Sequence, residues 1–281
     1  MSMDPGELAL LEETFRKTMS GASGQVLDIA LASLGWRELI AELPQVAIPL
    51  VFRLLGETAA QAPLLNDVLL CAAGLLPGGT LPLPYAGGSW VVWERCDAPS
   101  DVVDGELPLR VVPAGDAGDR LALAAGRRAV GWWLAGTGRA MLSLARAHVL
   151  DRVQFGRPLA AFQAVRHRLA ETFVALEGAE AALAGADAVA LSGADGEPAV
   201  VPAAVLAAVL AKAAAGQAAL TAARHCQQVL GGIGFTAEHG LHRHVRRALV
   251  LDGLLGSARE LSREAGTLLV KERSAPRLVE L

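Results

Sequence analysis

The long helical patterns in the second half of this 281-residue chain constrain its fold most strongly. From Leu121 onward, apolar residues recur at the spacing of successive helical turns over residues 130–145, 162–176 and about 203–229, and two shorter patterns follow. A helix with one apolar stripe must bury that stripe against another element, and long neighbouring helices bury theirs by packing side by side. The sequence therefore predicts an antiparallel bundle of four or five helices over 121–281.

The first 120 residues have a different pattern. Residues 1–75 carry shorter helical patterns interrupted by glycine and proline, which predict an N-terminal helical domain. Prolines become frequent in 76–120, where two runs, 90–94 and 107–112, have the composition of strands. This segment is too short to close a β-barrel by ordinary strand geometry. We therefore expect a mainly α fold with a truncated β segment in its middle.

Charge and hydropathy exclude some classes of partner. The formal net charge is −4, whereas proteins that bind nucleic acid usually carry a basic excess. The most apolar stretch, 198–211, contains Pro202 and ends at Lys212, so it is too short to span a membrane. Asp4 and Glu7 stand where a signal peptide would be basic or apolar. We expect a cytoplasmic protein that binds neither nucleic acid nor a membrane.

The cysteines and histidines do not indicate a metal site. The three cysteines are an odd number without short spacing, which argues against a disulfide framework and a zinc site. Several histidines and arginines gather near the C-terminal end, where no carboxylate completes a ligand set at helical spacing. We interpret this cluster as a solvated basic helix face or a patch for a phosphate. Its members are His225, His239, His242, His244, Arg243, Arg246 and Arg247.

A tight link between two helical patterns can hold an anion. Residues 151–159 place Arg152, Gln154 and Phe155 together where one helix ends and the next begins. The guanidinium offers a planar fork of donors, and a helix start offers free backbone amides. A plain surface turn with a capping arginine explains the same residues, and composition alone favours it.

A glycine-rich segment follows the third long helix. Glycines at 231, 232 and 234 allow a positive φ and the close approach of a phosphate or another backbone. The segment ends a helix rather than opening one after a strand, and no Lys-Ser/Thr pair follows it. It therefore supports neither a dinucleotide fingerprint nor a Walker loop.

Taken together, the two segments resemble the C-terminal domain of the acyl-CoA dehydrogenase family. The family's Arg-x-x-Phe-Gly-x-Pro motif and the Phe-Gln pair after it match Arg152, Phe155, Gly156, Pro158, Phe162 and Gln163. The family's Gln-x-x-Gly-Gly-x-Gly-Phe/Tyr-x-x-Glu motif matches Gln228, Gly231, Gly232, Gly234, Phe235 and Glu238. The likeness covers about 1–75 and 120–275.

The resemblance implies a flavoprotein with FAD at a subunit interface. In the family, a carboxylate removes the α-proton of an acyl-CoA thioester while a hydride passes from the β-carbon to the flavin. Carried over, the contacts to the diphosphate and adenosine would come from Arg152, Gln154 and Phe155, and those to the adenine end from Gln228, Gly231 and Gly232. A gapless match adds Ser257 as a cofactor contact and Arg127 as a substrate contact.

This chain departs from the family at the catalytic base. The gapless match puts Leu255 at the usual glutamate position and Gly126 at the alternative one, and neither side chain can take a proton. Because the β segment is also short, the chain resembles one subunit of a heteromeric dehydrogenase. We expect an α2β2 assembly in which a second acyl-CoA dehydrogenase-like subunit supplies the base, acting on an acyl-CoA such as a steroid side-chain thioester.

Two alternatives stay open. The chain can be a scaffold or regulator that kept the fold and lost the flavin, or a homo-oligomeric dehydrogenase with a displaced base such as Asp252. Glu260, on the other side of the lost base position, is more typical of a solvated surface residue. Trp132 and Trp133 are large enough to anchor a core or an interface rather than to line a substrate site.

Overall fold

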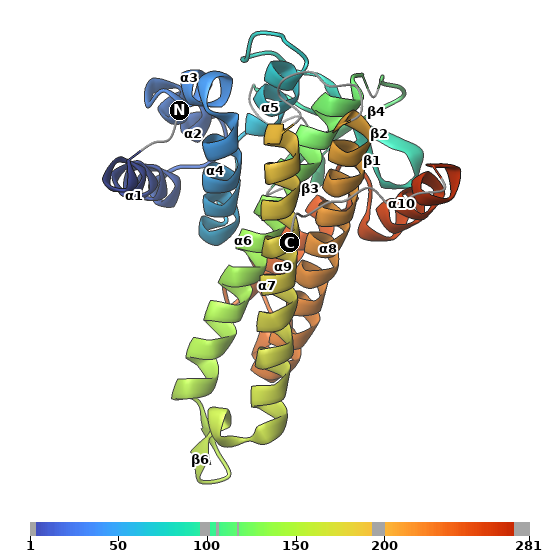
Figure 1. The fold of residues 1–281 in the computed structure, drawn as a ribbon. Coiled ribbons are helices and arrows are strands. Elements are labelled where there is room, and N and C mark those ends of the chain that lie inside the picture. The colour runs from blue at the N-terminus through green and yellow to red at the C-terminus, as the bar shows by residue number, and fades with distance from the viewer. Residues whose placement is uncertain (1–3, 96–101, 105–106, 117, 193–199, 273–281) are drawn as a thin grey trace.

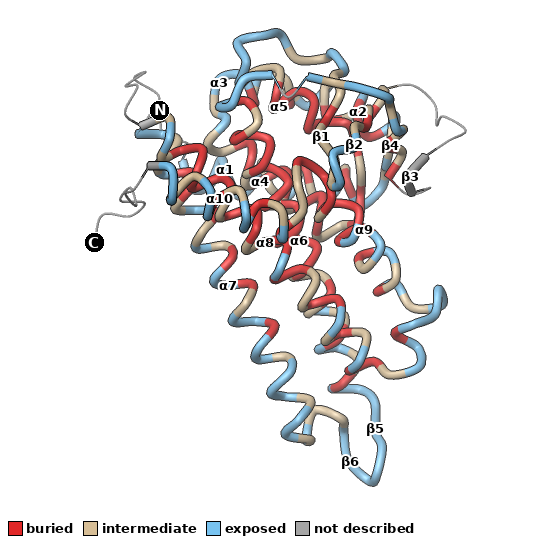
Figure 2. The backbone as a smooth tube through the Cα atoms, turned by 90° about the vertical axis from the view of Figure 1, so that its right-hand side faces the viewer, coloured by how far each residue is buried: buried red, intermediate tan, exposed pale blue. Residues whose placement is uncertain are grey.

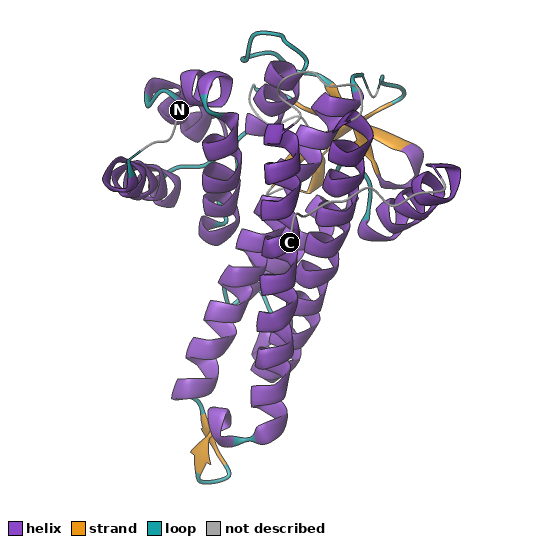
Figure 3. Cartoon of the chain, in the orientation of Figure 1, coloured by secondary structure: helices purple, strands orange, loops and turns teal. Residues whose placement is uncertain are grey.

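The fold is described by a computed structural model that defines residues 4–95, 102–104, 107–116, 118–192 and 200–272. Helices dominate, and a small sheet lies beside the upper part of a long helical bundle (Figures 1 and 3). The predicted mainly α architecture is therefore confirmed. Buried backbone concentrates where the N-terminal helices, the sheet and the upper bundle meet, whereas the far tip of the bundle is exposed (Figure 2).

Five helices form the N-terminal part. They are α1 (Pro5–Gly21), α2 (Gly24–Ser33), α3 (Trp36–Glu42), α4 (Pro44–Thr58) and α5 (Leu64–Ala72). Helix α1 begins at a capping box, because the Asp4 carboxylate accepts from the backbone N–H of Gly6 at 2.9 Å and Glu7 reaches back to Asp4. Pro5 at the first helical position adds to this start.

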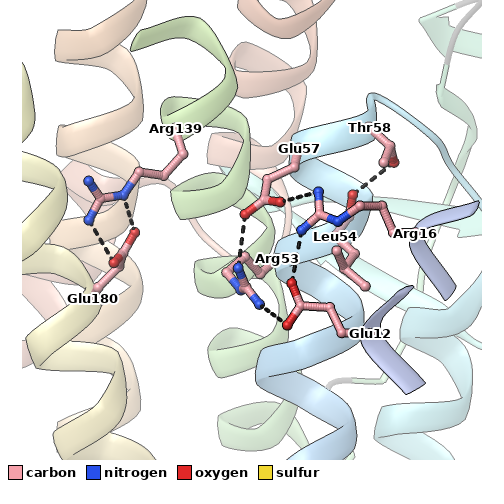
Figure 4. Close-up of polar contacts among 8 residues, drawn as sticks. All are labelled: Glu12, Arg16, Arg53, Leu54, Glu57, Thr58, Arg139 and Glu180. Atoms are coloured by element: carbon pink, nitrogen blue, oxygen red, sulfur yellow. Dashed lines mark hydrogen bonds and ion pairs between the residues drawn. The ribbon is translucent and has the colours of Figure 1, made fainter. Parts of the chain in front are cut away.

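A ring of four alternating charges joins α1 to α4 (Figure 4). Glu12 pairs with Arg16 at 2.9 Å and with Arg53 at 3.1 Å, and Glu57 pairs with the same two arginines at 2.7 and 3.1 Å. Each charge has two opposite neighbours, so the ring resists displacement more than an isolated surface pair does.

The sheet is antiparallel and open. Its strands are β1 (Pro82–Tyr85), β2 (Ser89–Trp93), β3 (Val102–Asp104) and β4 (Leu107–Val112), in the order β1-β2-β4-β3. The two predicted strand runs correspond to β2 and β4. Leu83, Val91 and Leu109 are fully buried because alternate residues face the bundle. No barrel closes among the described residues.

The bundle consists of five helices. They are α6 (Arg120–Asp151), α7 (Gln163–Ser192), α8 (Val200–Leu230), α9 (Leu241–Gly253) and α10 (Ala258–Glu272). Helix α8 is long and apolar enough to cross a membrane, yet 72% of its most apolar window is buried. Core packing against α6, α7 and α10 accounts for this hydropathy. The predicted limits of the three domains stay a prediction.

Aromatic and ionic contacts join the three parts. Trp133 of α6 is fully buried and stacks on Trp93 of β2 at 5.6 Å, as expected of a core residue. Arg95 donates to both carboxylate oxygens of Asp28, at 2.6 and 2.8 Å, and also pairs with Asp67. Asp67 is buried and accepts from the indole N–H of Trp36 at 2.9 Å. These contacts fix the N-terminal helices against the sheet.

Helices α4 and α6 cross at glycines. A Cβ on Gly56 would lie 2.4 Å from the backbone N of Thr137, and one on Gly136 would lie 2.1 Å from the carbonyl oxygen of Arg53. Real Cβ atoms do not approach backbone so closely. Only glycine therefore permits this crossing.

We expect Gly136→Ala to lower the free energy of unfolding by about 1–3 kcal/mol or more, because the added methyl group forces two backbones apart. Gly178 of α7 has no atom within 4 Å of its Cβ position, so Gly178→Ala is the matched control. That change should raise stability by up to about 1 kcal/mol through helix propensity. Denaturant unfolding measures both, and equal effects would contradict the close crossing.

Candidate functional site

The two segments singled out in the sequence lie together at the tip of the bundle. Helix α6 leads into a two-stranded hairpin, β5 (Val153–Gln154) and β6 (Arg157–Pro158), while α8 leads into the 3-10 helix η3 (Gly231–Phe235). Between them is a groove of about 430 Å³. One side of it is formed by the α6 end and hairpin and the other by the α8 end and η3. Its lining residues are His148, Arg152, Gln154, Leu159, Val229, Leu230, Gly231, Gly232 and Ile233.

The hairpin projects from the tip of the bundle (Figure 1) and carries an exposed aromatic ring. Phe155 has φ +53° and Gly156 has φ +78°, as a two-residue hairpin turn requires. The Phe155 side chain is 90% exposed, and its ring lies 6.1 Å from that of Phe162. A residue other than glycine is strained in the left-handed region. An apolar side chain that stays exposed to water contributes no burial free energy that could offset this strain. The ring is therefore accessible to another molecule.

Arg152 is available to a ligand. Its backbone N–H donates to the His148 carbonyl at 2.9 Å and ends α6. Among the described residues, no carboxylate pairs with its exposed guanidinium. Gln154 also lines the groove, and its side-chain amide donates to the adjacent Val153 carbonyl at 2.8 Å.

The glycine side of the groove is open. Gly231 has φ +66°, and no atom lies within 4 Å of a Cβ position on either Gly231 or Gly232. A ligand can therefore lie directly on this backbone. Gln228 is exposed on the last turn of α8, beside the groove but not in its lining. An arginine fork, open backbone and an aromatic ring form a site suited to a phosphate-bearing, partly planar ligand.

The two candidate base positions lie against each other at the opposite end of α6. Leu255 is 1% exposed, has φ +58°, and donates its N–H to the carbonyl of Pro84 at 2.8 Å. Its Cδ1 would lie 2.8 Å from a Cβ on Gly126. The leucine side chain thus fills the space in front of Gly126, together with Leu69.

Hydrogen bonds fix the loop that carries Leu255. Arg127 donates from Nε to the Leu255 carbonyl at 3.2 Å and forms a bidentate ion pair with Glu264, both bonds at 2.8 Å. Lys212 donates from Nζ to the Asp252 carbonyl at 2.8 Å and to the Gly256 carbonyl. Arg127 is 7% exposed and its guanidinium already binds Leu255 and Glu264. The predicted contact with a substrate would have to compete with these bonds.

Ser257 and Glu260 form a capping box at the start of α10. The Glu260 carboxylate accepts from the Ser257 N–H at 2.9 Å, and Ser257 Oγ accepts from the Glu260 N–H at 3.3 Å. Glu260 also accepts from the Gly87 N–H at 2.8 Å, and these bonds lower its pKa. Glu260 thus stays accessible at the surface, as expected, and in addition caps α10. Ser257, expected at a cofactor, is engaged in the cap.

A larger cavity, of about 780 Å³, lies between α8, α9 and α10. Its lining includes Arg224, Arg259, Arg263 and the candidate displaced base Asp252, but not Leu255. One oxygen of Asp252 accepts from the Ala258 N–H at 3.1 Å. Asp252 therefore opens into a different space from the one that Leu255 fills.

The basic cluster near the C-terminal end is only partly solvated. Arg247 is 2% exposed, donates to the Ala60 carbonyl at 2.8 Å and lies over the Trp133 ring at 5.6 Å. His244 is also buried, so the solvated-face interpretation is wrong for these two residues. Within the described ranges, no group of three or more His, Cys, Asp or Glu side chains could hold a metal.

Sequence reasoning missed His148, which lines the groove. It lies four residues before Arg152, a spacing that places two side chains on one helix face. That spacing was the available signal.

Residues 119–263 match the family model described as acyl-CoA dehydrogenase, C-terminal domain. The chain is 36% identical over 197 residues to the acyl-CoA dehydrogenase FadE34 of Mycobacterium tuberculosis, a match that covers 66% of this chain and 27% of FadE34. The chain thus matches about a quarter of that relative's length.

Solved structures share the fold. A variant of the Tcur3481–Tcur3483 steroid ACAD superposes with a TM-score of 0.68 at 20% identity, over 96% of this chain and 99% of that one. The ChsE4–ChsE5 complex from Mycobacterium tuberculosis gives a TM-score of 0.61 at 19% identity, over 98% of this chain and 99% of that one. At these identities the likeness concerns the fold alone.

The buried Lys212 should make stability depend on pH. Burial lowers its pKa from 10.5 to about 7, with Asp252 opposing the shift and Arg127 adding to it. Between these values the unfolded chain binds a proton that the folded chain has lost, so stability rises with pH. The stability of wild type relative to Lys212→Met should rise by up to about 1.4 kcal/mol per pH unit from pH 7 upward. Denaturant unfolding of both proteins at several pH values measures this difference in stability. If the free energies of unfolding of the two proteins changed in parallel with pH, the lowered pKa of Lys212 would be contradicted.

Proposed function

The chain belongs to the acyl-CoA dehydrogenase family, and from this premise we propose that it is one subunit of a heteromeric, FAD-dependent acyl-CoA dehydrogenase. In this proposal the groove at its tip holds the adenosine diphosphate half of an FAD bound largely by a second, acyl-CoA dehydrogenase-like subunit. That partner supplies the base and the pocket for the flavin ring. The observation that carries the proposal is that both motifs meet in one groove while both base positions are closed.

The groove fits the diphosphate end of FAD. The Arg152 guanidinium has no carboxylate partner among the described residues and can bind a diphosphate through charge-assisted hydrogen bonds. The open backbone at Gly231 and Gly232 leaves room for a flat adenine. Phe155 is 90% exposed on the hairpin beside this groove, so its ring is accessible to the cofactor or to the subunit that carries it.

The opposite end of α6 does not fit a flavin ring and a thioester. Leu255 occupies the space in front of Gly126, and Arg127 and Lys212 hold its loop through backbone carbonyls. When bound, FAD supplies the acceptor for the hydride of the β-carbon. The residues of this chain bind and orient that cofactor, and the proton is removed by a carboxylate of the partner.

The substrate class and assembly are supported by the two structural neighbours. One is named a steroid ACAD with two components, and the other is named as a complex of two proteins. We propose an α2β2 assembly that dehydrogenates an acyl-CoA with a steroid side chain, located in the cytoplasm.

The first test is to purify the chain alone and together with a co-expressed acyl-CoA dehydrogenase-like partner, and to record the visible spectrum and native mass of each preparation. A chain that is colourless alone and yellow in a larger complex supports the proposal. A stable complex without flavin would instead identify a scaffold. A yellow chain that acyl-CoA bleaches without a partner would identify a homo-oligomeric enzyme, and loss of bleaching in Asp252→Asn would name its base.

Arg152→Ala should weaken flavin retention by the complex about ten- to a hundredfold, because a charge-assisted contact of about 1.5–3 kcal/mol is lost. The fold should be unchanged, since this side chain is exposed. Arg146→Ala removes another exposed arginine of α6 outside the groove and serves as the control. Flavin fluorescence after dialysis measures retention. Equal retention by Arg152→Ala and wild type would contradict the assignment.

A further inference from the structure

His148 shares the groove with Arg152. The two residues are one helical turn apart on α6, and both line the cavity of about 430 Å³. His148 is half-buried, whereas the arginine extends into solvent. The imidazole is thus less exposed than the guanidinium and lines the same groove as the backbone of Gly231 and Gly232.

A second imidazole lies against His148. Its ring meets that of His239 edge-on, with centroids 6.3 Å apart. His239 Nδ1 accepts from the Leu241 N–H at 3.1 Å, and its carbonyl accepts from Nδ1 of His242 at 2.9 Å. His239 therefore carries its proton on Nε2, the nitrogen that this bond leaves free.

The other elements that surround His148 contribute little negative charge. Along α6 its charged neighbours are Asp151 and Arg152. The hairpin contributes the amide of Gln154, and the end of α8 with η3 contributes apolar side chains and glycines. The groove lining contains no carboxylate. An anion that enters the groove therefore meets an arginine and an imidazole with no acidic competitor in the lining.

We infer that His148 is a second contact for the diphosphate of FAD, and that its protonation couples cofactor binding to the uptake of one proton from solvent. This inference rests on the proposed function. It adds a residue outside both sequence motifs to the site and makes the affinity for FAD depend on pH.

The direction of the pH dependence follows from the charges. Burial, then His239 and Arg152, lower the pKa of His148 below 6.5, and Asp151 partly opposes them. A bound diphosphate favours the imidazolium and raises this pKa. Between the lower pKa of the free protein and the higher pKa of the complex, binding takes up a proton, so affinity falls as pH rises. For one proton the dissociation constant increases by at most about tenfold per pH unit.

The experiment uses the co-expressed complex stripped of flavin, with FAD as the probe, because the diphosphate diester of FAD does not titrate near neutral pH. Isothermal titration from about pH 6 to pH 8 gives the affinity, and repetition in buffers of different ionisation enthalpy gives the protons taken up. His148→Gln keeps a polar side chain that cannot titrate. His225→Gln is the matched control, because His225 lies on α8, bonds to Thr172 and is outside the groove.

Wild type and His225→Gln should take up about half a proton on average over this range, and should bind FAD about five- to tenfold more tightly at pH 6 than at pH 8. His148→Gln should take up none and bind with the same affinity throughout. Proton uptake that persists in His148→Gln would overturn the inference and leave the proposed function intact. A wild-type complex that binds no FAD at any pH would overturn both.

Discussion

Every part of the structure is positioned by the burial of α6. This helix contacts the N-terminal helices through α4 and α5, and the bundle through α7, α8 and α9. Such contact on several sides requires small residues, and Gly136 meets the backbone of α4 with no room for a methyl group. Trp133 then fills the space between the N-terminal helices and the sheet. A substitution that displaces α6 would therefore disturb the packing of the N-terminal helices, the sheet and the bundle together.

The same helix carries the two regions that we propose for the cofactor contacts and for the lost base positions. Gly126 and Arg127 stand near its start, in a region closed by Leu255, and His148 and Arg152 stand at its end, in an open groove. Because both regions lie on one continuous helix, the distance between them is fixed. A subunit built in this way can hold one end of a cofactor while leaving the reacting atoms to another protein.

Periodicity in the sequence was sufficient to predict the bundle, the two strands β2 and β4, and the burial of Trp133, because burial on one face leaves a local pattern. The resemblance carried by the two motifs implied that Arg152 and Gly231 lie near each other, and both residues line one groove. The burial of Arg247 depends on Ala60, and the hydrogen bond from Gly87 to Glu260 likewise joins residues far apart in the chain, whereas the Ser257–Glu260 capping box is a local pattern. No local pattern contains such distant partners, and a charged residue is ordinarily exposed.

The exposed Phe155 at the hairpin tip has a consequence for the life of the subunit in the cell. A free copy displays an apolar ring at an exposed loop tip, the kind of position where proteases preferentially cut. Assembly with a partner that covers this ring would protect the loop. The abundance of the chain would then depend on the supply of its partner, because the hairpin would be covered only in the assembled complex.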